Sequence, residues 1–184
     1  MTARNAVFLD RDGVLVREIV IDGHPFAPVT LEAFELLPEA AGQIQRLRDA
    51  GFLCIVFTNQ PEMATGELAA DILDTMHGQL RATVPVDDIY VCPHRDADQC
   101  ACRKPLPGML TAAAEKFGVD LKGSFVIGDR WRDIEAGRTV GCYSILIERP
   151  YSACETADAR VDTLTEAVEA VLAQTDQNRA PSKP

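Results

Sequence analysis

Short apolar runs alternate with helical segments along this chain, and that alternation limits the folds open to it. The predicted strands are residues 6–9, 53–57, 89–92, 124–127 and 142–147. The predicted helices are residues 38–50, 67–81, 107–117, 132–140 and 163–173. Uninterrupted apolar runs are typical of strands buried on both faces. The sequence therefore predicts an α/β fold, a doubly wound, mainly parallel Rossmann-like sheet with helices on both faces.

The 184 residues suit one domain, which we expect over residues 1–174. Residues 14–35 contain an Asp22-Gly23 pair, which predicts a hairpin or flap. The inserts between elements are short, so no large cap domain is expected. Residues 175–184 are polar and contain two prolines, which predicts a disordered tail.

Charge and hydropathy exclude several classes of function. The net charge of −10 disfavours nucleic-acid or acidic-membrane binding. No apolar run approaches the roughly 20 residues of a membrane span, and residues 6–9 follow the N-terminus without a signal-peptide layout. We therefore expect a cytoplasmic protein.

Polar motifs stand where the predicted strands end. Asp10-Arg11-Asp12-Gly13 follows the first strand, Thr58-Asn59-Gln60 the second, and Gly128 to Asp133 the fourth. Because parallel sheets bind ligands outside the carboxyl ends of their strands, we expect Asp10, Thr58 and Asp129 to converge at one edge.

These residue types fit phosphoryl transfer. Asp10 is the predicted nucleophile, since a carboxylate can attack phosphorus. Asp12 is the predicted general acid and base. Lys104, in Arg103-Lys104-Pro105, would neutralise phosphoryl charge. The Asp-x-Asp-Gly motif alone would also suit a plain turn, whereas a calcium loop is excluded because its glycine would fall at position six.

Three further side chains are predicted to contact the substrate. The Thr58 hydroxyl would donate to a phosphoryl oxygen, and Asn59 and Arg103 would bind the phosphate or another part of the substrate. For Thr58, the alternative is a hydroxyl that only satisfies backbone groups. For Lys104, the alternative is a solvated side chain.

Asp129 and Asp133 are spaced one helical turn apart. Carboxylate oxygens are suitable ligands for Mg²⁺, so the pair is predicted to face one magnesium ion beside Asp10. For Asp133 alone, an N-cap role is the alternative.

A second constellation has the layout C-x-H-x5-C-x-C. It comprises Cys92, His94, Cys100 and Cys102. Four soft ligands within eleven residues predict a closed, tetrahedral structural zinc site, with free buried thiols as the alternative. The zinc would hold the loop that delivers Arg103 and Lys104.

The remaining histidines and cysteines receive simpler interpretations. His24 and His77 are expected on the surface, whereas Cys54 and Cys142 are expected in the core. Trp131 would either line the substrate pocket or pack against the start of its helix.

The order of the four motifs resembles the haloacid dehalogenase-like phosphohydrolases over nearly the whole chain. The zinc loop before Arg103 narrows the resemblance to a capless branch that contains D-glycero-D-manno-heptose 1,7-bisphosphate phosphatases and histidinol-phosphate phosphatases. The resemblance implies an aspartyl-phosphate intermediate and a monomer acting on a small phosphorylated metabolite. It also implies Mg²⁺ bound by Asp10, the backbone carbonyl of Asp12 and Asp129, with Asp133 in support.

Within that branch, some motifs resemble the heptose members and others the histidinol members. Residues 103–109, 34–38 and 133–137 resemble the heptose members, which act in surface-polysaccharide precursor synthesis. The short zinc loop and Thr65 resemble the histidinol members, and Thr65 replaces an arginine common in heptose members. A heptose or related sugar phosphate, with removal of the 7-phosphate, is the favoured substrate. Histidinol phosphate, a phosphomutase and a non-catalytic zinc-stabilised binding module are the alternatives.

Overall fold

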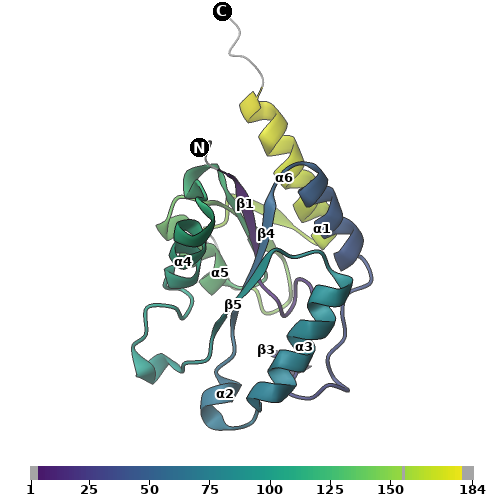
Figure 1. The fold of residues 1–184 in the computed structure, drawn as a ribbon, viewed down its shortest axis with the longest axis vertical. Helices are drawn as coiled ribbons and strands as arrows, with labels where there is room; N and C mark the ends of the chain where they lie inside the picture. The colour runs from purple at the N-terminus through teal and green to yellow at the C-terminus, as the bar shows by residue number, and fades with distance from the viewer. Residues whose placement is uncertain (1–3, 155, 180–184) are drawn as a thin grey trace, which may run out of the picture.

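The computed structural model describes residues 4–154 and 156–179, and its centre is a six-stranded parallel sheet (Figure 1). The strand order is β5-β4-β1-β6-β7-β8. The strands are β1 (Ala6–Leu9), β4 (Leu53–Asn59), β5 (Asp88–Cys92), β6 (Phe125–Gly128), β7 (Tyr143–Ile147) and β8 (Ala159–Val161). The predicted doubly wound α/β fold is confirmed, and β1 lies between the two halves that wind outward from it.

Helices cover both faces of the sheet. They are α1 (Ala40–Asp49), α2 (Glu62–Thr65), α3 (Ala70–Thr83), α4 (Gly108–Phe117), α5 (Trp131–Thr139) and α6 (Leu164–Arg179). In Figure 1, α4 and α5 lie on the opposite side of the sheet from α1 and α6. The buried side chains of α1, α3 and α6 share one apolar cluster, and those of α4 and α5 belong largely to another.

The central strand explains why its sequence is uniformly apolar. Val7 and Leu9 face the cluster of α1, α3 and α6, whereas Ala6 and Phe8 face the cluster of α4. All four side chains are fully buried, because helices cover both faces of this strand.

The structure adds elements that the sequence pattern did not indicate. The edge strand β8 and the one-turn helix α2 were not predicted. The expected hairpin is present as β2 (Ile19–Ile21) and β3 (His24–Phe26), with positive φ at Asp22 and Gly23. Among the described residues, no large cap domain covers the sheet edge.

The last helix is longer than predicted. α6 continues to Arg179, into the segment predicted as a disordered tail, and residues 180–184 lie outside the described residues. None of the described helices is both long and apolar enough to cross a membrane.

The surface assignment of His77 was wrong. Only 6 % of this residue is exposed, because it lies on the inner face of α3 with Leu73, Met76 and Leu80. Its Nε2 is 3.3 Å from Nη1 of Arg11. Burial, together with the neighbouring Arg11 charge, lowers the pKa of His77 to about 4. The expectations that His24 is exposed and that Cys54 and Cys142 are buried are confirmed.

Gly13 occupies a position that only glycine fits, which leads to a first prediction. Its φ is +87°, and a Cβ there would overlap the Asp129 carboxylate. Gly13→Ala should destabilise the fold by at least about 2 kcal/mol and lower the melting temperature by about 5 °C.

Gly78→Ala is the matched control, because Gly78 lies inside α3 with open space around its Cα. That change should stabilise the protein by up to about 1 kcal/mol. Equal melting temperatures for Gly13→Ala and the wild type would contradict the predicted overlap.

The lowered pKa of His77 predicts a pH-dependent stability. Above its ordinary value of 6.5 the histidine is neutral in both states. Between pH 6.5 and about 4 the unfolded chain binds a proton that the folded chain does not, so stability falls as the pH falls. By pH 5 the loss should be about 2 kcal/mol.

Urea unfolding at pH 7 and pH 5 measures this effect. Between pH 7 and pH 5, His77→Gln should lose less stability than the wild type. His24→Gln, at an exposed position, should lose as much stability as the wild type. An identical pH dependence in the wild type and His77→Gln would contradict the assignment.

Candidate active site

Three adjacent strands bring the predicted catalytic side chains to one edge of the sheet. Asp10 follows β1, Thr58 lies at the end of β4, and Asp129 follows β6. These strands are neighbours in the order β4-β1-β6, so the predicted convergence is present. A cleft opens above this edge, and Asp10, Asp12 and Asp129 line it.

Lys104 lies at the centre of a buried ionic cluster. Its Nζ is 2.8 Å from Oδ1 of Asp10 and 2.6 Å from Oδ1 of Asp133, and it donates to the Phe57 carbonyl at 3.0 Å. The residue is 3 % exposed. Its pKa is raised because the two carboxylates outweigh the opposing effect of burial. Lys104 therefore stays charged, and a solvated lysine is excluded.

Asp10, Asp129 and Asp133 form a carboxylate group suited to a cation. One oxygen from each lies within 4.8 Å of the others, and all three residues are buried. Asp129 Oδ1 is buried without a hydrogen-bond partner. Burial and the Asp10 charge raise the pKa of Asp129 well above its usual range and that of Asp133 to about 6. Lys104 is the one cation in contact with Asp10 and Asp133. A divalent cation beside the three carboxyl groups would favour their charged forms, so the donor set fits such a cation.

Two neighbouring side chains orient Asp129. The Tyr151 hydroxyl is 2.6 Å from Asp129 Oδ2 and 3.0 Å from Glu18 Oε1. Ser152 donates its hydroxyl to the Asp129 carbonyl. Asp133 in turn accepts the backbone N–H of Arg130 at 3.0 Å. Arg130 is the N-cap residue of α5 and Asp133 is its third helical residue, so the N-cap alternative for Asp133 was wrong, although its side chain caps the helix start as in a capping box.

Asp12 faces the same cleft from the turn after β1. Its Oδ1 accepts from Nε of Arg11 at 2.9 Å, and its Oδ2 accepts from Nε2 of Gln60 at 2.8 Å. Burial raises the pKa of Asp12, although the adjacent Arg11 charge favours the carboxylate. A raised pKa suits a group that must hold a proton before donating it.

Thr58 and Asn59 lie beside the cluster but have different contacts. Thr58 is 1 % exposed, and its Oγ1 accepts from Gln60. Asn59 lines the cleft, yet its amide accepts the N–H of Lys104 and donates to the Lys104 carbonyl. Asn59 therefore holds the backbone that carries the buried lysine.

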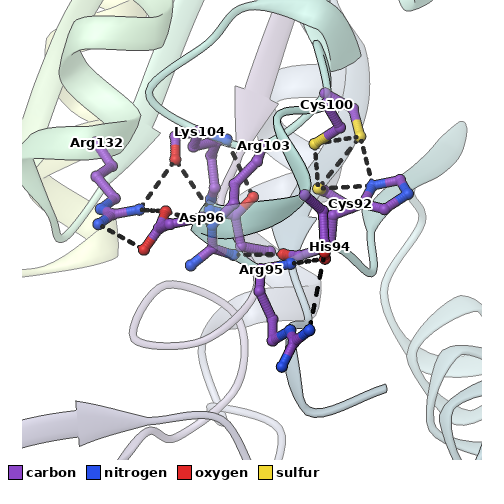
Figure 2. A network of polar contacts seen from close by, with 11 residues as sticks. Cys92, His94, Arg95, Asp96, Cys100, Arg103, Lys104 and Arg132 are labelled. Atoms are coloured by element: carbon purple, nitrogen blue, oxygen red, sulfur yellow. Dashed lines mark hydrogen bonds and ion pairs between the residues drawn. The ribbon is translucent and has the colours of Figure 1, made fainter. Parts of the chain in front are cut away.

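Asp96 joins the loop after β5 to helix α5 (Figure 2). Its carboxylate accepts from Nε of Arg103 at 2.7 Å and from Nη1 of Arg132 at 2.9 Å. Arg103 also donates to the His94 carbonyl. The two arginines, 29 positions apart in sequence, thus lie side by side at the cleft.

The four predicted zinc ligands converge in the same loop. Sulfur–sulfur distances among Cys92, Cys100 and Cys102 are 3.2–3.6 Å, and Nδ1 of His94 is 3.3 Å from the Cys102 sulfur. A tetrahedron with zinc–sulfur bonds of about 2.3 Å has edges of about 3.8 Å. The donor atoms are already close to that arrangement (Figure 2).

The walls of the cleft differ in charge. Arg103, Arg130 and Arg132 line it, and so do Glu18 and Glu62. Glu62 Oε2 is buried without a partner. Trp131 lies outside this cleft: it is 45 % exposed, with the Arg132 guanidinium 5.3 Å from its ring centroid.

Several residues of the site were missed by sequence reasoning. Arg11 and Gln60 stand inside the quoted motifs but received no role. His77 shares helical spacing with Leu73, Met76 and Leu80, and this spacing predicts a buried side chain. Tyr151 lies in an irregular segment and Asp96 begins a three-residue 3-10 helix, Asp96–Asp98, and neither segment carries a periodic signal.

Comparisons with known proteins point to one family. Residues 101–170 match the model of a HAD-hydrolase-like family. The chain is 39 % identical over 151 residues to the D-glycero-beta-D-manno-heptose-1,7-bisphosphate 7-phosphatase of Pseudomonas aeruginosa, covering 79 % of this chain and 82 % of that protein. It is 36 % identical to the D-glycero-D-manno-heptose-1,7-bisphosphate 7-phosphatase of Thermosynechococcus vestitus, covering 79 % of each.

A solved structure is similar over nearly its whole length. D,D-heptose 1,7-bisphosphate phosphatase from B. bronchiseptica, complexed with magnesium and phosphate, superposes with a TM-score of 0.80 at 30 % identity. The match covers 92 % of this chain and 99 % of that one. With these relatives, and with the four motifs assembled at one edge of the sheet, the chain belongs to the haloacid dehalogenase-like phosphatases.

Proposed function

We propose that the protein hydrolyses a sugar phosphate through an aspartyl-phosphate on Asp10, with Mg²⁺ as cofactor. The observation that carries the proposal is the buried group of Asp10, Lys104, Asp129 and Asp133, with Asp12 facing the same cleft. A non-catalytic module would have no need for buried carboxylates that share one lysine, since burying charge is costly.

The residues divide the reaction between them. Asp10 attacks phosphorus as the bond to the leaving oxygen breaks, and Asp12 donates its proton to that oxygen. Asp12 then removes a proton from the water that attacks the phosphorylated Asp10. Lys104, held by Asn59, orients Asp10 and balances charge at the phosphoryl group. Thr58 Oγ1 accepts from Gln60, so its hydroxyl proton would be available to a phosphoryl oxygen.

The metal would be held by Asp10, Asp129 and the backbone carbonyl of Asp12, with Asp133 in support. The unpartnered Asp129 Oδ1 and the uncompensated negative charge fit a divalent cation there. Bound Mg²⁺ would stabilise charge on the phosphoryl oxygens.

Removal of magnesium tests the metal. Complete chelation should abolish phosphate release, and added Mg²⁺ should restore it, because the carboxylates otherwise repel the phosphoryl group. Asp10→Asn should be inactive with or without the metal. Turnover that survives complete chelation would refute the magnesium assignment.

We propose a structural zinc ion at Cys92, His94, Cys100 and Cys102. The near-tetrahedral donor set supports it, and the loop leads directly into Arg103 and Lys104. Zinc in this place would fix the loop and take no part in hydrolysis.

Cys100→Ser tests the zinc site. It should remove most of the bound zinc and lower the melting temperature, while changing kcat by a smaller factor. Cys154 lies outside the cluster, so the Cys154→Ser variant should bind as much zinc as the wild type. Zinc content and melting temperature equal to those of the wild type would count against the site.

The favoured substrate is D-glycero-D-manno-heptose 1,7-bisphosphate, with removal of the 7-phosphate. The names of the relatives support it, and so do the three arginines on the cleft, which suit a second phosphate. Thr65, which replaces an arginine common in heptose members, is exposed and bonds the Glu62 carbonyl. Arg103 and Arg132 therefore supply the cations that this position lacks.

One observation favours a second candidate, histidinol phosphate. The unpartnered carboxylate oxygen of Glu62 in the cleft would accept from the ammonium group of L-histidinol phosphate. In a heptose complex, the same oxygen would accept from a sugar hydroxyl.

A substrate panel distinguishes the two candidates. Phosphate release should be fastest from heptose 1,7-bisphosphate, and Arg132→Ala should raise KM for it by about tenfold or more because a charge-assisted contact is lost. KM for a sugar monophosphate should change by less than about threefold. A clear preference for L-histidinol phosphate, with no effect of Arg132→Ala, would overturn the assignment.

A further inference from the structure

The carboxylate of Asp12 is held on both of its oxygens. Nε and Nη2 of Arg11 each lie 2.9 Å from Oδ1, and Nε2 of Gln60 lies 2.8 Å from Oδ2. A carboxylate offers about four acceptor positions. The hydrogen bonds from Nε of Arg11 and Nε2 of Gln60 fill one position on each oxygen, whereas Nη2 of Arg11 lies near Oδ1 as an ion-pair contact without a hydrogen bond. One position on Oδ2 remains, on a side chain that is 13 % exposed and lines the cleft.

Arg11 is itself fixed from a distant part of the chain. It is fully buried, and its Nη1 lies 3.3 Å from Nε2 of His77 on α3. Because a guanidinium has only donors, Nε2 of His77 must accept, which places the imidazole proton on Nδ1. The guanidinium carbon of Arg11 also lies over the Phe34 ring, 5.7 Å from its centroid. The chain of contacts therefore runs from α3 through Arg11 to Asp12.

A buried arginine with these contacts has two possible roles. It can be an ion pair that stabilises the turn after β1, or it can hold Asp12 in the orientation that proton transfer requires. The second role explains why both Arg11 nitrogens near Asp12 lie against one oxygen, with one hydrogen bond, and why the other oxygen bonds Gln60. That division leaves one acceptor position of Oδ2 free of a protein hydrogen bond.

We propose that Arg11 and His77 are positioning residues for proton transfer by Asp12. His77 fixes Arg11, and Arg11 with Gln60 turns the free position of Oδ2 toward the substrate. When the phosphorus–oxygen bond to the leaving group breaks and the bond to Asp10 forms, the proton passes from Asp12 to the leaving oxygen. This inference rests on the proposed role of Asp12 as the general acid.

Two substrates with different leaving groups distinguish a positioning role for His77 from a role in stability alone. The phenolate of phenyl phosphate is a poor leaving group and needs a proton, whereas 2,4-dinitrophenolate departs without one. The kcat/KM for each ester reports only the steps up to departure of the leaving group. The ratio of the two values, measured on one preparation, does not depend on how much of the protein is folded.

The variants are His77→Leu, which removes the acceptor, and His77→Gln, which restores an oxygen near the place of Nε2. Met76→Leu controls for repacking of α3, because Met76 is a buried neighbour on the same helix. His77→Leu should lower kcat/KM for phenyl phosphate by about tenfold or more and that for 2,4-dinitrophenyl phosphate by less than about threefold. His77→Gln and Met76→Leu should keep the wild-type ratio.

Asp12→Asn provides the reference for the proposed function. Its kcat/KM for phenyl phosphate should fall selectively, as in His77→Leu, and by a larger factor. If Asp12→Asn loses both activities equally, Asp12 is not the general acid and the proposed function is wrong in that step. If Asp12→Asn is selective but His77→Leu leaves the ratio unchanged, the positioning role is refuted.

Discussion

The structure depends on a concentration of negative charge at one edge of the sheet. Asp10, Asp129 and Asp133 are all buried there, with Lys104 between two of them. Buried like charges repel strongly and lose their hydration, so the arrangement persists only with compensation. Lys104 supplies part of it, and a divalent cation beside Asp129 would supply the rest. The same imbalance prepares the site for a phosphoryl group once the metal is bound.

The need to place one lysine explains much of the surrounding architecture. Lys104 comes from an irregular loop, where a long side chain would ordinarily be mobile. The Cys92–Cys102 loop gathers three sulfur atoms and one imidazole nitrogen just before it, and Asn59 of β4 holds the Lys104 backbone. Asp96 then ties Arg103 to Arg132 on α5 (Figure 2). The zinc-type cluster is thus connected to the catalytic edge through backbone and ion pairs.

Sequence reasoning predicted the parts that local pattern determines. Apolar runs such as Ala6–Leu9 indicated strands, and strand-end motifs indicated the edge where Asp10, Thr58 and Asp129 meet. The pairing of Asp96 with Arg132 could not be predicted, because it depends on how the loop after β5, with its short 3-10 helix, folds against α5. β8 is too short and too exposed to carry a strand pattern. His77 was misplaced because a polar residue was judged by its type, whereas its helical spacing indicated burial.

A direct test of the central claim is to identify the phosphorylated side chain. The enzyme is mixed with Mg²⁺ and 4-nitrophenyl phosphate, quenched in acid within one turnover and treated with borohydride, which reduces an acyl phosphate to an alcohol. Mass spectrometry of the peptide that contains Asp10 and Asp12 then locates the change. We expect conversion of Asp10 to homoserine, with Asp12 intact. Reduction at Asp12, or at neither residue while phosphate is released, would contradict nucleophilic catalysis by Asp10.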